Sequence, residues 1–251
     1  MNQAEKARAF AALHRKGQPL LLYNVWDAGT AKAVADAGAK AIATGSWSVA
    51  AAHGYPDGEA IPLDLALRIV ARIAATVDLP LTVDFEGGYA VEPERLAANA
   101  DRLLATGAIG VNFEDRVVGG SGLHPVDLQT RRIAALRRAA DERGVPLFVN
   151  ARTDLFLGEP DASRHAALMD EAMERAAAYA EAGADGFFVP ALVEESLIAR
   201  VTEASRLPVN VMMRPGLPPL DRLGRLGVAR VSWGPAPYRE AMERIRAAAV
   251  V

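Results

Sequence analysis

Eight short apolar runs recur along this chain, and the residue that introduces each run alternates strictly between proline and glycine. Stretches with helical periodicity separate most of the runs. The runs cover residues 20–24, 41–44, 81–84, 110–114, 147–152, 186–190, 209–212 and 229–233. The internal repeat is therefore two strand–helix units long.

The introducing residues suit the starts of parallel strands. Proline precedes the odd runs, where the first strand residue needs no backbone donor, and glycine precedes the even runs, where it ends a helix at positive φ. The prolines are Pro19, Pro80, Pro146 and Pro208, and the glycines are Gly38, Gly107, Gly183 and Gly227. Nearly continuous apolar character indicates strands covered on both faces. Eight such units within 251 residues predict one α/β domain with the (β/α)8 TIM-barrel fold.

Apolar residues at spacings of three and four predict the outer helices. These segments are 63–76, 92–106, 127–143 and 162–181, and their apolar stripes are expected to pack against the barrel. Residues 1–16 predict a polar amphipathic helix, residues 237–249 a last helix, and residues 158–162 a loop.

Composition excludes several classes of protein. The 28 basic and 31 acidic side chains are spread evenly, and no basic block could follow a nucleic-acid backbone. No apolar run approaches the roughly 18 residues that a membrane span needs, and the N-terminus does not resemble a signal peptide, so we expect a cytoplasmic protein without a membrane partner. The absence of cysteine excludes disulfides, thiolate metal sites and a cysteine nucleophile.

Acidic residues follow the third and fourth runs, at the barrel end where such folds carry their active sites. Asp84 and Glu86 are two residues apart, so both can project to one side, and Glu114 arrives from the neighbouring strand. Three carboxylates without a nearby histidine or cysteine predict a site for a hard cation, Mg²⁺ or Mn²⁺. The alternative is that these acids form ion pairs or cap helices.

Other strand ends carry candidate substrate-binding groups. The planar fork of Arg152 would grip a substrate carboxylate with two parallel bonds, although it could instead pair with Glu114 or Asp154. Residues 44–47 precede an expected helix start, and their backbone N–H groups and hydroxyls would bind an anionic oxygen of the substrate. The substrate-binding candidates are Tyr23, Thr44, Gly45, Ser46, Trp47, Asp84, Arg152 and Asn210.

From about residue 20 to residue 235 the chain resembles the isocitrate lyase and phosphoenolpyruvate mutase superfamily. The resemblance is carried by YNVWDAGTAKAVADAGAKAIATGSWSVAAAHGYPDGE, VDFEGGYA, GVNFEDR, NARTD and GVARVSWGP. It implies that Asp84 binds Mg²⁺ directly and that Glu86 and Glu114 hold it mainly through water. It also implies that Ser46 and the backbone at Trp47 receive the substrate carboxylate, that Arg152 contacts the substrate, and that Asp57 lies on a loop near the reacting end.

The chain departs from the superfamily pattern after Asp115. Isocitrate and methylisocitrate lyases have a K-K-C-G-H loop at this point, whose cysteine serves as general acid. Phosphoenolpyruvate mutases have lysine and asparagine on the same loop. This chain instead has RVVGGSGLHP. Ser121 and His124 are the candidate proton carriers on this glycine-rich, lid-like loop, and a solvated loop histidine is the alternative for His124. The glutamate that methylisocitrate lyases have after strand six is also missing, because Pro190 follows Phe188 and Val189.

These features predict a Mg²⁺-dependent lyase that cleaves a carbon–carbon bond of a small 2-oxo or 2-hydroxy di- or tricarboxylic acid. Aldol-type cleavage and decarboxylation would share a metal-bound enolate. The alternatives are a phosphonopyruvate mutase or hydrolase and a barrel that binds a 2-oxo acid without turnover. From the resemblance we also expect a homo-oligomer, either a dimer or a tetramer.

Overall fold

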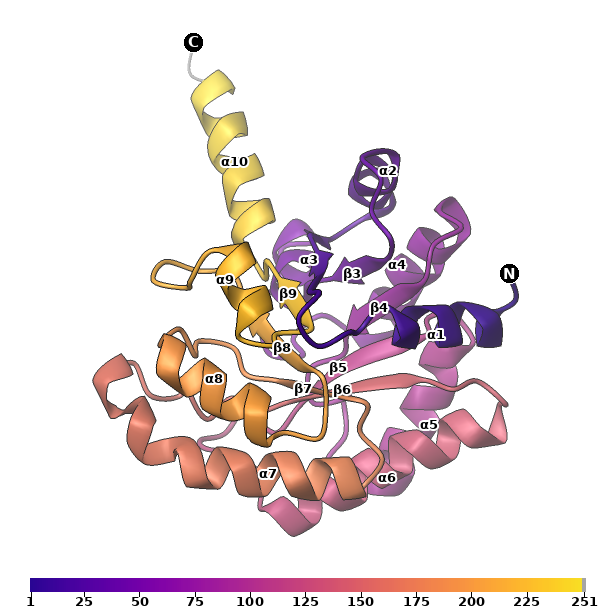
Figure 1. Ribbon diagram of the computed structural model, residues 1–251. Coiled ribbons are helices and arrows are strands. Elements are labelled where there is room, and N and C mark those ends of the chain that lie inside the picture. Colours follow the sequence, from indigo (N-terminus) through magenta and orange to yellow (C-terminus); the bar gives the residue numbers. More distant parts are fainter. Residues whose placement is uncertain (250–251) are drawn as a thin grey trace.

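The computed structural model describes residues 1–249, and its strands form one parallel barrel (Figure 1). The strands are β1 (Leu20–Leu22), β2 (Asn24–Val25), β3 (Ile42–Thr44), β4 (Leu81–Asp84), β5 (Gly110–Glu114), β6 (Phe148–Arg152), β7 (Gly186–Phe188), β8 (Val209–Met212) and β9 (Arg230–Ser232). Their order in the sheet is β1-β9-β8-β7-β6-β5-β4-β3-β2. Strands β1 and β2 are two pieces of the first predicted strand, interrupted at Tyr23. Because β1 pairs with β9 and β2 pairs with β3, the first strand closes the sheet, and the predicted (β/α)8 barrel is confirmed.

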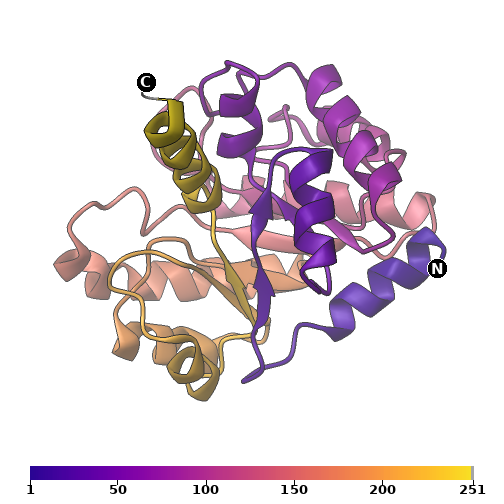
Figure 2. The same ribbon diagram turned by 90° about the horizontal axis from the view of Figure 1, so that it is seen from above.

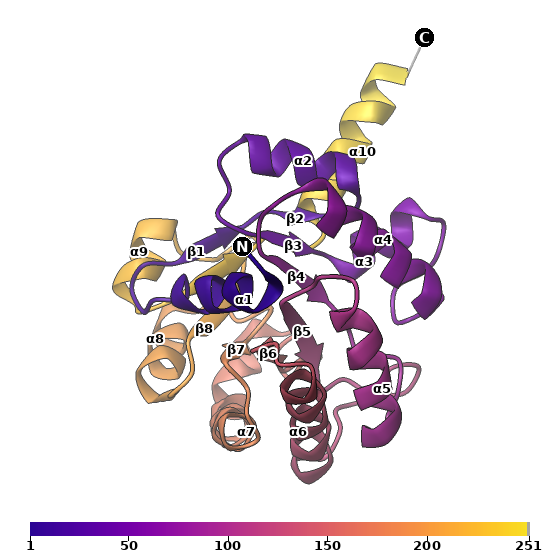
Figure 3. The same cartoon turned by 90° about the vertical axis from the view of Figure 1, so that its right-hand side faces the viewer.

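The helices surround this barrel, as the view along its axis shows (Figure 3). They are α1 (Gln3–Ala12), α2 (Ala28–Asp36), α3 (Ser46–Ala52), α4 (Leu63–Thr76), α5 (Pro93–Leu104), α6 (Val126–Glu142), α7 (Met169–Glu181), α8 (Glu195–Ala204), α9 (Leu220–Arg225) and α10 (Ala236–Ala249), with a 3-10 helix, η1 (Ala162–Leu168). Helix α4 has the predicted bounds, whereas the predicted helix 162–181 consists of η1 followed by α7. Over residues 1–249, no helix has both the length and the apolar character that crossing a membrane requires.

The apolar stripes of the outer helices are buried against the strands, as predicted. Leu67, Val70 and Ile73 of α4 and Leu96 and Leu103 of α5 are examples. Full burial of such a side chain contributes about 1.5–3 kcal/mol, so these stripes hold the helix ring to the barrel.

Helix α1 covers the amino ends of the strands. Phe10 packs edge-on against Phe148 at the start of β6, with ring centroids 5.3 Å apart, and His14 stacks on the same ring at 4.1 Å. Helix α10 extends from the opposite end of the barrel (Figures 1 and 2). The carboxyl ends of the strands therefore remain the open end at which polar side chains gather.

Candidate active site

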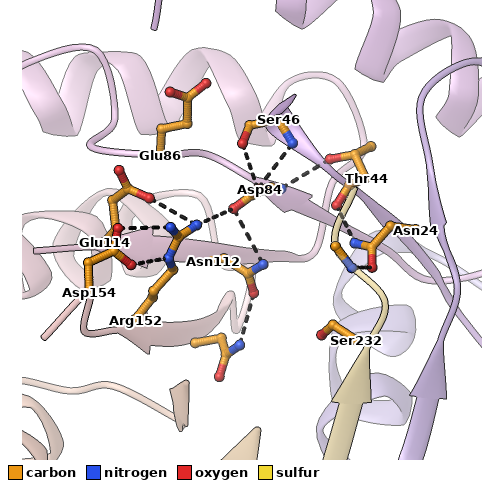
Figure 4. A network of polar contacts seen from close by, with 12 residues as sticks. Asn24, Thr44, Ser46, Asp84, Glu86, Asn112, Glu114, Arg152, Asp154 and Ser232 are labelled. Carbon is orange, nitrogen blue, oxygen red and sulfur yellow. Dashed lines mark hydrogen bonds and ion pairs between the residues drawn. The ribbon is translucent and has the colours of Figure 1, made fainter. Parts of the chain in front are cut away.

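Asp84, the last residue of β4, is at the centre of a hydrogen-bonded cluster (Figure 4). The hydroxyl and backbone N–H of Ser46 both donate to Asp84 Oδ2, at 2.7 and 3.1 Å. The amide of Asn112 donates to Asp84 Oδ1 at 3.4 Å, and the backbone N–H of Asp84 donates to Thr44 Oγ1 at 3.0 Å. Three neighbouring strand ends, β3, β4 and β5, thus fix the orientation of this carboxylate.

Arg152, at the end of β6, lies among three carboxylates. Its Nε and Nη2 donate to the two oxygens of Asp154 at 2.5 and 2.9 Å. Its Nη1 faces Glu114 at 3.0 Å and Asp84 at 3.9 Å (Figure 4). Arg152 is therefore paired with Glu114 and Asp154, which is the alternative that the sequence left open. This pairing leaves Nη1 as the guanidinium nitrogen that faces Glu114 and Asp84.

Glu86 is held by a tight turn after β4. Its backbone is left-handed (φ 51°), which costs a residue with a side chain about 1–3 kcal/mol. The Glu86 carboxylate accepts a hydrogen bond from the Glu59 N–H at 2.6 Å, and the Glu59 carboxylate accepts one from the Tyr89 N–H at 2.8 Å. These two bonds join the turn to the loop that carries Asp57.

A cavity of about 280 Å³ lies between these groups. Ser46, Asp57, Gly58, Glu86, Glu114, Arg116, Val118, Gly119, Gly120 and Arg152 line it. A second cavity of about 480 Å³ also contacts Arg116 and Gly120 and is lined further by leucines, including Leu155 and Leu157. Since both cavities share Arg116 and Gly120, they adjoin.

Carboxyl groups outnumber guanidinium groups in the lining of the smaller cavity, where Asp57, Glu86 and Glu114 accompany Arg116 and Arg152. Burial, followed by the neighbouring Asp84 and Asp57, raises the pKa of Glu86 to about 8. Burial and then Asp84 raise the pKa of Asp57, and burial raises that of Glu114 although Arg152 opposes the rise. The nearby arginines are therefore too few to keep the pKa values of these carboxyl groups in their usual range. A bound metal ion would supply the missing positive charge.

The donor set fits Mg²⁺ better than a softer ion. Asp84, Glu86 and Glu114 offer only hard oxygen ligands, which suit Mg²⁺ and Mn²⁺. Within residues 1–249, no three aspartate, glutamate, histidine or cysteine side chains lie close enough together to form a ready-made metal cage. An ion held there would have few direct protein ligands and would keep several waters, which is the usual arrangement for Mg²⁺.

The β3–α3 corner contains the other predicted substrate-binding groups. Helix α3 begins at Ser46 with Gly45 as its N-cap, close to the predicted helix start. The Trp47 ring packs edge-on against Tyr238 and lies under Arg239, at the base of α10. The Trp47 ring is therefore engaged with α10.

Four further candidates lie away from the smaller cavity. Tyr23 is 42% exposed and contacts Trp233, and Asn210 is buried inside the barrel. Ser121 lines the larger cavity. His124 is buried rather than solvated, and its backbone N–H and carbonyl bond to Asp115 and Arg175. It lines neither cavity.

Two residues of the GVNFEDR motif, Asn112 and Arg116, lie at the site although the sequence gave them no role. Asn112 donates to Asp84, and its position two residues before Glu114 on one strand is the signal that could have placed both on the inner face. Arg116 lines both cavities and has no ion-pair partner within 4 Å among residues 1–249. Its place in an irregular loop gave no such signal.

Comparison with known proteins identifies the family. The family model for phosphoenolpyruvate phosphomutase matches residues 10–251. The chain belongs to the phosphoenolpyruvate phosphomutase family. An uncharacterized protein of Mycobacterium tuberculosis is 35% identical over 92% of this chain and 83% of its own length. 2-methylisocitrate lyase of Escherichia coli (strain K12) is 30% identical over 83% of this chain and 70% of its own length. The predicted superfamily is confirmed.

Solved structures agree with this assignment. A "putative phosphonomutase" from Burkholderia cenocepacia is 50% identical with a TM-score of 0.95, covering 98% of both chains. Phosphonopyruvate hydrolase in complex with oxalate and Mg²⁺ shares the fold, with a TM-score of 0.84 and 22% identity over 98% of this chain and 85% of its own. The superfamily thus contains enzymes that act on small organic acids, with a metal bound in one structural neighbour.

Proposed function

We propose that this protein is a Mg²⁺-dependent carbon–carbon lyase that acts on a small 2-oxo or 2-hydroxy acid, with Mn²⁺ as the alternative ion. The observation that carries the proposal is the group of undercompensated carboxylates around one 280 Å³ cavity, beside the donors Ser46 and Arg152. Asp84, Glu86 and Glu114 are the residues that would hold the ion. When bound, Mg²⁺ polarises the 2-oxo group and makes the acid a better electron acceptor.

Ser46 and Arg152 bind the substrate in this proposal. The hydroxyl and N–H of Ser46 now hold Asp84 Oδ2, and on substrate binding they donate to the substrate carboxylate instead. Arg152 is locked by Asp154 through Nε and Nη2, so that Nη1 meets the substrate without a large loss of side-chain entropy.

Asp57 is the proposed proton carrier. It lines the smaller cavity, and its pKa is raised by burial and by Asp84, so it holds a proton closer to neutral pH than an exposed aspartate does. Ser121 in the larger cavity is the second candidate, whereas the burial of His124 speaks against that residue. Proton delivery from Asp57 would replace the cysteine acid that this chain lacks.

The adjoining cavity extends the proposal to substrate size. Its volume of about 480 Å³ accommodates the remainder of a di- or tricarboxylic acid. Arg116, which lies between the two cavities and has no ion-pair partner within residues 1–249, would receive a second carboxylate. The same lid-like loop, residues 116–124, carries Arg116 and Gly120. Closure over a small acid would exclude water from both cavities.

A phosphonopyruvate mutase or hydrolase is the second candidate function. It is favoured by the 50% identity to the Burkholderia cenocepacia structure. The loop after Asp115 lacks the lysine and asparagine that resemblance to such mutases would require, and we therefore rank this candidate below the lyase.

A turnover assay separates the candidates. The purified protein is incubated with Mg²⁺ and oxaloacetate, methylisocitrate or phosphonopyruvate, and products are followed by NMR, with Asp84→Asn as the inactive control. Mg²⁺-dependent products from a carbon acid support the lyase, and turnover of phosphonopyruvate alone supports phosphorus chemistry. Tight binding of these acids without turnover across a broad panel would leave a binding barrel.

We also propose that the chain assembles into a homo-oligomer, as a dimer or tetramer. Helix α10 extends away from the barrel and, apart from its base, packs little against it (Figures 1 and 3). Light scattering at micromolar concentration tests this proposal, and a monomeric mass contradicts it.

A further inference from the structure

Arg230 of β9 is a buried cation inside the barrel. Its side chain is 1% exposed, and Nη2 donates to Asn112 Oδ1 at 3.0 Å. Nε and Nη1 have no hydrogen-bond partner among residues 1–249, and no carboxylate there lies within ion-pair distance of the guanidinium. Burying such a charged group is unfavourable, and an apolar side chain of similar length would cost less.

The contact with Asn112 determines which way that amide faces. Arginine is only a donor, so the Asn112 atom facing Arg230 must be the oxygen. Asn150 Nδ2 donates to the same oxygen at 2.8 Å, which uses both of its acceptor sites. The Asn112 Nδ2 is therefore turned toward Asp84 Oδ1, at 3.4 Å.

A further amide supports this arrangement from the other side. Asn150 Nδ2 also donates to Asn210 Oδ1 at 3.0 Å, and Asn210 Nδ2 donates to the carbonyls of Val211 and Arg230. Because backbone carbonyls accept only, the orientation of Asn210 is fixed as well. Asn150 thus donates in two directions, to Asn210 and to Asn112, and on the second side the Asn112 amide in turn donates to Asp84, the candidate metal ligand.

We propose that Arg230 is a positioning residue that acts on Asp84 through Asn112. By holding the Asn112 oxygen, Arg230 keeps Asn112 Nδ2 turned toward Asp84 Oδ1, while Ser46 holds Oδ2. This inference rests on the proposed function, in which Asp84 binds Mg²⁺. It also accounts for a buried arginine that has no ion-pair partner among the described residues.

The test is a double-mutant cycle with Mn²⁺ as the probe. Binding of Mn²⁺ to the full chain is measured by the loss of the free-ion signal in electron paramagnetic resonance, and thermal unfolding is followed in parallel. Arg230→Met is expected to weaken Mn²⁺ binding about tenfold, as loss of a supporting group around a metal ligand typically does, without lowering Tm. In an Asn112→Leu background the same substitution should no longer weaken Mn²⁺ binding.

Arg137→Met is the matched control. Arg137 bonds the backbone carbonyls of Leu147 and Gly183 and pairs with Asp185, and it lies at the amino ends of the strands, away from Asn112 and Asp84. This variant should lower Tm and leave Mn²⁺ affinity unchanged. The Arg137→Met variant thus shows the effect of removing an arginine that has only a structural role.

Each of the following outcomes would overturn the inference. Arg230→Met could lower Tm without changing Mn²⁺ affinity, or it could weaken Mn²⁺ binding equally in both backgrounds, and in either case Asn112 is not the intermediary. If Asp84→Asn abolishes binding while Arg230→Met is silent, only this inference fails. If the wild-type chain binds no Mn²⁺, or if Asp84→Asn binds it as well as the wild type, the proposed function fails too.

Discussion

Replacement of His14 should change how the stability of the barrel depends on pH. His14 is buried under α1, its ring stacks on Phe148, and Nδ1 lies 2.9 Å from the carbonyl of Phe10. Its Nε2 has no hydrogen-bond partner among the described residues. Burial, followed by the nearby charge of Arg230, lowers the pKa of His14 from 6.5 to about 3.

The sign and size of the effect follow from this pKa. Below pH 6.5 the unfolded chain binds a proton at His14 that the folded chain rejects, so the free energy of unfolding falls as the pH drops from 6.5 toward 3. Each pH unit within that window costs about 1.4 kcal/mol, so the loss between pH 7.5 and pH 5 is about 2 kcal/mol.

Urea unfolding of the wild type and His14→Phe at both pH values measures this loss. Other titrating groups are common to the two proteins, so the difference between their pH dependences isolates His14. The variant should lose about 2 kcal/mol less than the wild type on going from pH 7.5 to pH 5. Exposed His53 makes the same contact with a carbonyl four residues earlier, so His53→Phe is the control and should follow the wild type. Parallel pH curves for His14→Phe and the wild type would refute the reasoning.

Three further predictions test the site and its supports. Ser46→Ala should weaken binding of oxalate in the presence of Mg²⁺ about tenfold, because a hydrogen bond to a charged group is lost, whereas Ser48→Ala should not; calorimetry measures both, and equal effects would contradict the role of Ser46. Arg116→Gln should raise KM for dicarboxylic substrates more than for monocarboxylic ones, and a uniform rise would remove Arg116 as a carboxylate receptor. Gly88→Ala should lower the free energy of unfolding by about 2 kcal/mol or more, because the new Cβ would lie 2.2 Å from Leu96 Cδ1. Gly54 has a similar positive φ but open space around it, so Gly54→Ala should lower it by about 1 kcal/mol. Similar losses for the two variants would show that packing at Gly88 does not matter.

The barrel was predictable because its signals are local. Proline or glycine marks each strand start, and strand ends at the carboxyl face followed directly from the apolar runs. The break of the first strand at Tyr23 and the 3-10 turn before α7 had no such signal. Both depend on how the chain meets its neighbours, which propensity does not encode.

The convergence of residues at the candidate site was predictable only in part, and their contacts were not. Asp84, Glu114 and Arg152 do converge, since their strands are adjacent. The left-handed turn at Glu86 directs its carboxylate to the backbone of Glu59, a loop residue that no periodicity connects to it.

Buried charge was the hardest feature to foresee. Arg230 occupies an otherwise apolar run, and only the pairing of β9 with β8, which places it opposite Asn210, reveals that it faces the polar interior. His124 shows the opposite error, because a glycine-rich loop indicated exposure and the folded loop buries it against Asp115 and Arg175.

A crystal structure of this protein grown with Mn²⁺ and oxalate tests the central claim most directly, through the anomalous signal of the metal. The account predicts one peak at bonding distance from the Asp84 carboxylate, with Glu86 and Glu114 facing its bound waters and with Ser46 and Arg152 on the oxalate. A structure without that peak, in which Asp84 still bonds Ser46 and Glu114 still pairs with Arg152, would contradict it.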